Sequence, residues 1–214
     1  MTKPRVLLAD DHKLVVEGFK KLLENQCELV GIVDNGRDLL EAAVRLQPDL
    51  VILDISMPLL NGLDAARQLQ KLLPGGKLIF VTMHGDATYA KAAFQAGASG
   101  YLLKRSAPDE LNHAIQSVLQ GNYYVSPLIT KDVIQFLLDR SSEPACDGEE
   151  LTFRQREILQ LLTEGHSVKE IAKVLKISPR TVESHKAHFM EQLDLHTTAE
   201  LIKYALTHGL ISTE

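Results

Sequence analysis

The chain has 214 residues, of which 45% are hydrophobic, and a formal net charge of −5. Such a chain is long enough for two small domains with ordinary cores. No apolar run approaches the roughly 20 residues of a membrane-spanning helix, so we expect no contact with a membrane. The acidic balance excludes a generally basic nucleic-acid binder, and the isolated Cys27 and Cys146 offer neither a disulfide framework nor a metal-binding pair. We therefore expect a reduced, cytoplasmic protein in which any DNA-binding surface is local.

Short apolar runs alternate with helical patterns along the first half of the chain. The runs predict strands at Val6–Ala9, Leu29–Val33, Leu50–Leu53, Leu78–Val81 and Gly100–Leu103. Apolar residues at helical spacing predict helices at residues 14–23, 39–46, 65–73, 89–96 and 111–119. This alternation predicts an α/β fold with a doubly wound, five-stranded parallel sheet.

Two of these strands end in carboxylates. Asp54 follows Leu50–Leu53, and Asp10 and Asp11 follow Val6–Ala9. Because ligands of open α/β sheets bind at the carboxyl ends of the strands, we expect the three side chains to meet there. Uncompensated, they would repel one another, and a cation that prefers oxygen ligands, most simply Mg²⁺, would remove that cost. The simpler alternative is that Asp54 only begins the turn that follows its strand.

A lysine and a hydroxyl are predicted at the same edge of the sheet. Lys104 follows the fifth strand and Thr82 ends the fourth, so both side chains can reach the carboxylates. Each of them alone could be an ordinary surface or strand-end residue. Together with the carboxylates they predict phosphoryl transfer to Asp54, because a carboxylate attacks phosphorus only when the phosphoryl charge is held and neutralised.

The order and spacing of these residues resemble the receiver domain of two-component response regulators, which has a flavodoxin-like fold. The matching motifs, which lie within roughly the first half of the chain, are Asp10-Asp11, Asp54-Ile55-Ser56-Met57-Pro58, Asn61-Gly62, Val81-Thr82 and Gly100-Tyr101-Leu102-Leu103-Lys104. One departure is Arg105, which adds a cation where related receivers often carry proline or an acidic or small polar residue.

The resemblance also implies residue roles. A sensor histidine kinase would phosphorylate Asp54, with Thr82 and Lys104 holding the phosphoryl group. Thr82 and Tyr101 would form the conformational switch, although Tyr101 could equally pack at the sheet edge. His84 could tune the lifetime of the phosphate or be an exposed loop residue. The Mg²⁺ ligands would be Asp10, Asp11, Asp54 and the backbone carbonyl of Ser56.

The composition changes after the predicted sheet. We expect a receiver domain at residues 1–124, a linker at 125–148 with a helix from Pro127 to Arg140, and a C-terminal domain at 149–214. The linker ends in a polar stretch broken by Pro144 and Gly148. Helical periodicity then continues, and N-caps are expected at Thr152, Ser167 and Ser178, with Gly209 ending the last helix. This pattern predicts a small all-α domain of four helices.

The C-terminal pattern resembles the LuxR-type helix-turn-helix over nearly all of residues 150–211, and with the receiver it matches the NarL/FixJ type of response regulator. Two short helices joined by a tight turn can place the second, from Pro179 to about Leu193, in the major groove of DNA. The alternative is a small helical protein-binding domain. Gln192 stands where the family usually has a basic residue. The expected DNA contacts are Lys176, Ser178, Arg180, Thr181, Glu183, Ser184, Lys186, Ala187 and His188.

These features predict a transcriptional regulator, not an enzyme, with at most self-phosphorylation and self-dephosphorylation chemistry. After phosphorylation it would form a homodimer and bind double-stranded promoter DNA. Residues 148–214 carry 8 basic and 10 acidic side chains, so a single copy should bind weakly and pairing should help. Two alternatives are a receiver that serves as a constitutive dimer module, and a hydrolase with Asp54-x-Ser56 as its nucleophile loop.

Overall fold

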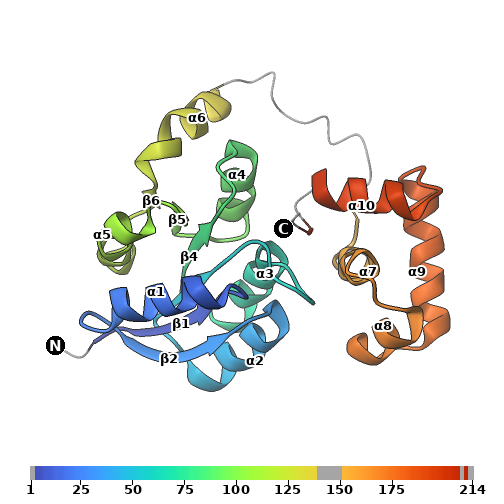
Figure 1. Cartoon of the computed structure of the whole chain (residues 1–214), viewed down its shortest axis with the longest axis horizontal. Coiled ribbons are helices and arrows are strands. Elements are labelled where there is room, and N and C mark those ends of the chain that lie inside the picture. Colours follow the sequence, from blue (N-terminus) through green and yellow to red (C-terminus); the bar gives the residue numbers. More distant parts are fainter. Residues whose placement is uncertain (1–2, 139–150, 208–209, 212–214) are drawn as a thin grey trace. The chain divides into compact units, whose positions relative to one another are not determined.

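The structure is a computed structural model, and it describes residues 3–138, 151–207 and 210–211. The chain forms two compact units, Met1–Ser142 and Glu143–Glu214 (Figure 1). In the described residues, no helix is both long and apolar enough to cross a membrane. The two units are described separately below.

A parallel sheet forms the centre of the first unit. Its strands are β1 (Arg5–Ala9), β2 (Glu28–Val33), β3 (Leu50–Leu53), β4 (Lys77–Thr82), β5 (Gly100–Leu103) and β6 (Tyr124–Val125). They lie in the order β2-β1-β3-β4-β5-β6, and every neighbouring pair is parallel. The predicted α/β fold with a doubly wound sheet is confirmed, with β6 added as a short sixth strand at the edge.

Helices cover both faces of this sheet. They are α1 (Lys13–Leu23), α2 (Gly36–Leu46), α3 (Gly62–Leu72), α4 (Ala87–Gln95), α5 (Ala107–Leu119) and α6 (Pro127–Leu138). One core layer joins α1 and α5 to alternate residues of β1, β3, β4 and β5, whereas α3 contacts α2 and α4. The chain leaves β1 toward β2 and returns to β3 on the other side, so the carboxyl ends of β1 and β3 form the topological switch point of the sheet.

Side-chain caps fix where several helices begin. The Asn35 side chain accepts hydrogen bonds from the backbone N–H groups of Arg37 and Asp38 at the start of α2. Asn61 caps α3 in the same way through the backbone N–H of Asp64. These caps satisfy backbone donors that have no partner within the helix, and they define the loops that surround the carboxyl ends of the strands.

The helix predicted within the linker is α6, and it packs against α4 in the first unit. Ile129 and Val133 are buried there, whereas Leu128, Ile134 and Leu138 are exposed. The remainder of the predicted linker, from residue 139 to residue 148, lies outside the described residues.

The second unit contains α7 (Phe153–Thr163), α8 (Val168–Leu175), α9 (Pro179–Gln192) and α10 (Thr198–Thr207). Thr152 and Ser167 both form capping boxes, with Gln155 and Glu170 respectively, and Ser178 caps α9. Helix α7 contacts α8, α9 and α10, and α8 contacts α9, so one small core serves all of them. The predicted four-helix domain is confirmed, although Gly209 lies outside the described residues.

Candidate functional site

Three acidic side chains converge at the carboxyl ends of β1 and β3. Ala9 and Leu53 are partners in the parallel register, so Asp10 and Asp54 leave the sheet side by side. Both are buried, with exposed fractions of 3% and 2%. One oxygen atom each from Asp10, Asp11 and Asp54 and one nitrogen atom of His12 all lie within 4.8 Å of one another. The predicted meeting of carboxylates at this edge is what the structure shows.

The backbone around Asp54 holds its carboxylate in one place. Its N–H donates to the carbonyl of Ala9 at 3.0 Å, and its Oδ1 accepts a hydrogen bond from the backbone N–H of Ile55 at 2.6 Å. Gly62, at the start of α3, lies so close that a Cβ atom there would stand 1.9 Å from the carbonyl oxygen of Asp54. Only glycine therefore lets α3 approach the end of β3.

Lys104 links two of the carboxylates. Its Nζ lies 2.7 Å from Oδ2 of Asp54 and 2.8 Å from Oδ2 of Asp10, and its side chain is only 5% exposed. Burial alone would lower the pKa of Lys104, but the charge of Asp54 and hydrogen bonds to Asp10 and Asp54 raise it overall. The ammonium therefore stays charged and neutralises part of the acidic cluster.

Asp11 has an oxygen atom that the protein does not satisfy. Its Oδ1 is buried and accepts no hydrogen bond, although Nδ1 of His12 lies 3.0 Å away. Burial raises the pKa of Asp11 most, and the charges of Asp10 and Asp54 add to this against the opposing effects of His12 and a backbone hydrogen bond. A buried carboxylate oxygen without a donor, next to two further carboxylates, fits a divalent cation that binds oxygen.

His12 belongs to this cluster, although no sequence motif pointed to it. Its Nδ1 lies 3.0 Å from Oδ1 of Asp10, 3.0 Å from Oδ1 of Asp11 and 4.0 Å from Oδ2 of Asp54. The same atom is 3.2 Å from Nζ of Lys104. The available signal was position alone, because His12 directly follows the acidic pair and stands at the N-cap of α1.

Thr82, Tyr101 and Ser56 are joined through His84. Thr82 is fully buried at the end of β4, and its hydroxyl faces the backbone N–H of His84 at 3.4 Å. Tyr101 is also fully buried, and its hydroxyl donates to the carbonyl of His84 at 2.7 Å. The His84 ring lies 2.9 Å from the Ser56 hydroxyl and stacks on Tyr89. These contacts connect the loop after β3 with the loop after β4 and with β5.

The environment of His84 favours its neutral form. Burial lowers the pKa of His84 most, and the charge of Lys104 adds to this against the opposing effect of Asp54. A neutral ring can exchange a hydrogen bond with Ser56 without bringing a further positive charge to the cluster.

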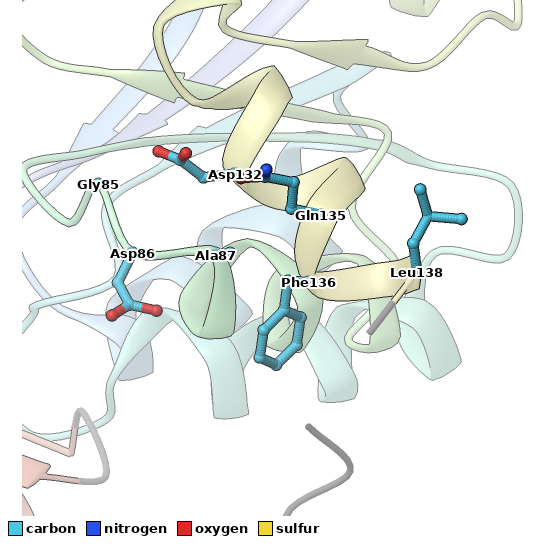
Figure 2. Close-up of a pocket in the computed structure, with 7 residues that line it drawn as sticks. All are labelled: Gly85, Asp86, Ala87, Asp132, Gln135, Phe136 and Leu138. Carbon is cyan, nitrogen blue, oxygen red and sulfur yellow. The ribbon is translucent and has the colours of Figure 1, made fainter. Parts of the chain in front are cut away.

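A separate pocket of about 890 Å³ lies between the loop after β4 and α6 (Figure 2). Asp86 and Asp132 contribute carboxylates to its lining, and Phe136 contributes a ring beneath Lys91. The carboxylates of Asp10, Asp11 and Asp54 do not line this pocket. It is a feature of α4 and α6, distinct from the cluster at the end of the sheet.

The predicted DNA-contacting residues lie on and just before α9. Val182 and Phe189 are buried and hold α9 to the core. Thr181 and Lys186 are half-buried, and Ser178 uses its hydroxyl to cap the backbone N–H of Thr181 at 3.1 Å. The side chains exposed to solvent are Lys176, Arg180, Glu183, Ser184, Ala187 and His188.

Gln192 is used inside the second unit. Its Oε1 accepts a hydrogen bond from Gln155, at 3.4 Å, and Gln155 in turn completes the capping box of α7. The side chain that stands where the resemblance implies a basic residue is therefore tied to α7.

Comparisons with known proteins agree with this geometry. A model of the response regulator receiver domain matches residues 6–116, and a model of the luxR family of bacterial regulatory proteins matches residues 149–205. The transcriptional regulatory protein MctR of Rhizobium johnstonii is 37% identical over 98% of this chain and 96% of its own length. The response regulator UvrY of Escherichia coli is 34% identical over 98% of this chain and 96% of its own length.

Solved structures of response regulators also resemble this chain over nearly its whole length. One structure of the RcsB response regulator of Salmonella typhimurium has a TM-score of 0.65 and 27% identity, covering 97% of this chain and 98% of that one. A structure of an RcsB–DNA complex has a TM-score of 0.60 and 25% identity, covering 95% and 98%.

The fold and the domain matches define a phosphorylation-dependent, DNA-binding transcription regulator, and the family is not one of classical enzymes. The chain belongs to the two-component response regulators that carry a LuxR-type helix-turn-helix domain. The predicted family is thereby confirmed.

Proposed function

We propose that a sensor histidine kinase transfers a phosphoryl group to Asp54 in the cytoplasm, and that the phosphorylated protein dimerises and binds promoter DNA. The observation that carries this proposal is the position of Lys104, whose Nζ lies 2.7 Å from Asp54 and 2.8 Å from Asp10. A buried ammonium that already contacts the Asp54 carboxylate is what a doubly charged phosphoryl group needs on arrival.

Asp54 is the acceptor. A carboxylate oxygen of Asp54 forms the new P–O bond while the P–N bond of the phosphohistidine breaks, and the leaving imidazole nitrogen takes up a proton. Lys104 then pairs with a phosphoryl oxygen instead of the two carboxylates. Self-phosphorylation from a small phosphodonor and self-dephosphorylation by water would use the same groups.

Mg²⁺ would be held by Asp10, Asp11, Asp54 and the backbone carbonyl of Ser56. When bound, it supplies the positive charge that offsets the phosphoryl oxygens. The buried oxygen of Asp11 supports this assignment, because it accepts no hydrogen bond from the described residues and can serve as a ligand of the cation.

Thr82 and Tyr101 would carry the signal away from Asp54. A phosphoryl group on Asp54 would offer an acceptor to the Thr82 hydroxyl, which accepts a long hydrogen bond from the N–H of His84. Movement of Thr82 and the adjoining loop would change the packing of Tyr101, because the Tyr101 hydroxyl is bonded to the same residue, His84. The surface formed by α4, β5 and α5 would then differ between the two states.

In the second unit, α9 would enter the major groove. Its capped N-terminus, with Ser178 and Thr181, suits a phosphate group, as do Lys176, Arg180 and Lys186. Glu183, Ser184, Ala187 and His188 are placed on exposed faces that can meet base edges. One solved structure of RcsB holds two RcsB dimers bound to two parallel DNAs, which supports a dimer here.

The test is the mass of the full-length protein in solution with Mg²⁺ and beryllofluoride, which mimics a phosphoryl group. The wild-type protein should shift from monomer to dimer and Asp54→Asn should not. Asp49→Asn, at the opposite end of β3, is the matched control and should behave like the wild type. A dimer fraction that is the same in all three proteins, with or without the reagent, would support a constitutive dimer module and defeat the proposal.

A further inference from the structure

We propose that His12 is a nitrogen ligand of the cation at the acidic site, and that this chain therefore favours transition-metal cations such as Co²⁺ over Mg²⁺ more than an all-oxygen site would. The inference rests on the proposed function in one respect, namely that the carboxylates of Asp10, Asp11 and Asp54 form a cation site.

The spacing of the donor atoms supports a shared ion. Neighbouring ligands of an octahedral cation with bonds of about 2.1 Å stand about 3.0 Å apart, and opposite ligands about 4.2 Å apart. Nδ1 of His12 lies 3.0 Å from Oδ1 of Asp10 and 3.0 Å from Oδ1 of Asp11. It lies 4.0 Å from Oδ2 of Asp54. The imidazole nitrogen thus occupies a vertex of the same ligand set as the carboxylates.

The backbone keeps His12 at this vertex. The residue is the N-cap of α1, where its carbonyl accepts the N–H of Val16 at 3.1 Å. Its own N–H donates to Oδ1 of Asp10 at 2.9 Å. The main chain is thus tied on both sides, and the side chain of His12 is 35% exposed.

The nitrogen changes which cations the site favours. Mg²⁺ prefers an all-oxygen shell, whereas imidazole is a good ligand for Co²⁺, Ni²⁺ and Zn²⁺. One imidazole among carboxylates should therefore strengthen Co²⁺ binding while contributing little to Mg²⁺ binding. His12 would act as a specificity-determining residue for the cation, and the phosphoryl chemistry would remain that of Asp54.

The direct test is pulsed electron paramagnetic resonance of Mn²⁺ bound to the full-length protein. Coordination by His12 should produce a ¹⁴N modulation that disappears when the histidines are labelled with ¹⁵N. The modulation should also disappear in His12→Asn, which replaces the imidazole with an oxygen donor. It should persist in His84→Asn, the other imidazole near the cluster, and in His113→Asn on α5.

A second measurement addresses selectivity. Calorimetric titration should show that His12→Asn lowers the affinity for Co²⁺ relative to Mg²⁺ by about tenfold, with His113→Asn unchanged.

Stoichiometric Mn²⁺ binding without a histidine ¹⁴N signal, or an unchanged affinity ratio in His12→Asn, would overturn the role of His12 and leave the carboxylate site standing. Failure of the wild-type protein to bind Mn²⁺, or undiminished binding in Asp11→Asn, would overturn the cation site itself and this inference with it.

Discussion

Asp11 is a residue at which the acidic cluster lowers the stability of the folded protein when no cation is bound. One of its oxygens is buried without a hydrogen bond, and its pKa is raised by burial and by the charges of Asp10 and Asp54. A carboxylate with a raised pKa in the folded state opposes folding at pH values above its ordinary pKa, because the unfolded chain carries the same charge in water. The residue is therefore unfavourable for stability, although it suits the proposed cation.

Replacing Asp11 with Asn should separate these two effects. Without a divalent cation, Asp11→Asn should raise the melting temperature of the first unit by about 3 °C, because a buried charge is removed. The same variant should bind Mg²⁺ at least about tenfold more weakly, because it loses an anionic ligand. Thermal unfolding in EDTA and calorimetric Mg²⁺ titration measure the two changes. Asp132→Asn, an exposed control on α6, should alter neither, and a lower melting temperature for Asp11→Asn would contradict the explanation.

Much of the acidic site could be predicted from the sequence. Asp10, Asp11, Asp54, Thr82 and Lys104 all follow or end buried strands, and parallel strands bring their carboxyl ends together whatever the details of packing. The role of the His12 ring could not be predicted in this way, because its direction depends on the turn between β1 and α1. The contact between Ser56 and His84 likewise depends on the conformations of two loops. The spacing of apolar residues does not predict those conformations.

At the scale of elements, Ser126 fastens α6 to the rest of the first unit. It is fully buried, and its N–H donates to the carbonyl of Tyr101 at 2.9 Å. Its hydroxyl lies 3.1 Å from Glu110 on α5 and 3.3 Å from the hydroxyl of Ser106, two residues beyond Lys104. Its carbonyl accepts the N–H of Ile129 in the first turn of α6. One residue thus joins β5, the start of α5 and the start of α6.

Removing the Ser126 hydroxyl should loosen this junction. Ser126→Ala leaves the Glu110 carboxylate with one fewer donor, and we expect a loss of about 1 to 2 kcal/mol in the free energy of unfolding. Amide hydrogen exchange in α6 should quicken more than exchange in β1. Urea unfolding of the full-length protein and exchange mass spectrometry measure these effects. Ser117→Ala on α5 is the control, and equal protection of α6 in both variants would show that the hydroxyl does not hold the helix.

The elements themselves were predictable to different degrees. The strands β1 to β5 all contain continuous apolar runs, so they were visible in the sequence, although β2, at the edge of the sheet, is only partly buried. Strand β6 has two residues, too few to show an alternation of apolar and polar side chains. It is recognisable only by its pairing with β5. Helix α6 was predicted, but its apolar residues point in several directions, and only the contact with α4 shows which of them are buried.

At the scale of the whole molecule, binding to DNA must come from a local surface, because residues 148–214 hold 8 basic and 10 acidic side chains. Lys176, Arg180 and Lys186 are the phosphate contacts proposed for each copy. A dimer would then make about six such contacts, which predicts a slope of about −5 in a plot of log affinity against log salt concentration.

The substitution Lys186→Ala tests this number of phosphate contacts. It should weaken binding to the cognate promoter and to unrelated DNA by a similar factor, because a phosphate contact carries no sequence information. In a dimer it should also make the salt slope shallower by about 2. Fluorescence anisotropy of labelled duplexes between low and moderate salt measures both. Lys71→Ala in the first unit should leave the slope unchanged, and an unchanged slope for Lys186→Ala would remove this lysine from the interface.

Tyr101 is fully buried with its hydroxyl bonded to the carbonyl of His84, and the proposed switch would move it between this conformation and a second one. Where two such conformations differ by only a few kcal/mol, a fraction of the molecules occupies the signalling one at all times. Dimer formation then depends on how many copies the cell makes as well as on the kinase. Gene dosage becomes a second input, and overproduction should switch on target promoters in cells that never receive the stimulus.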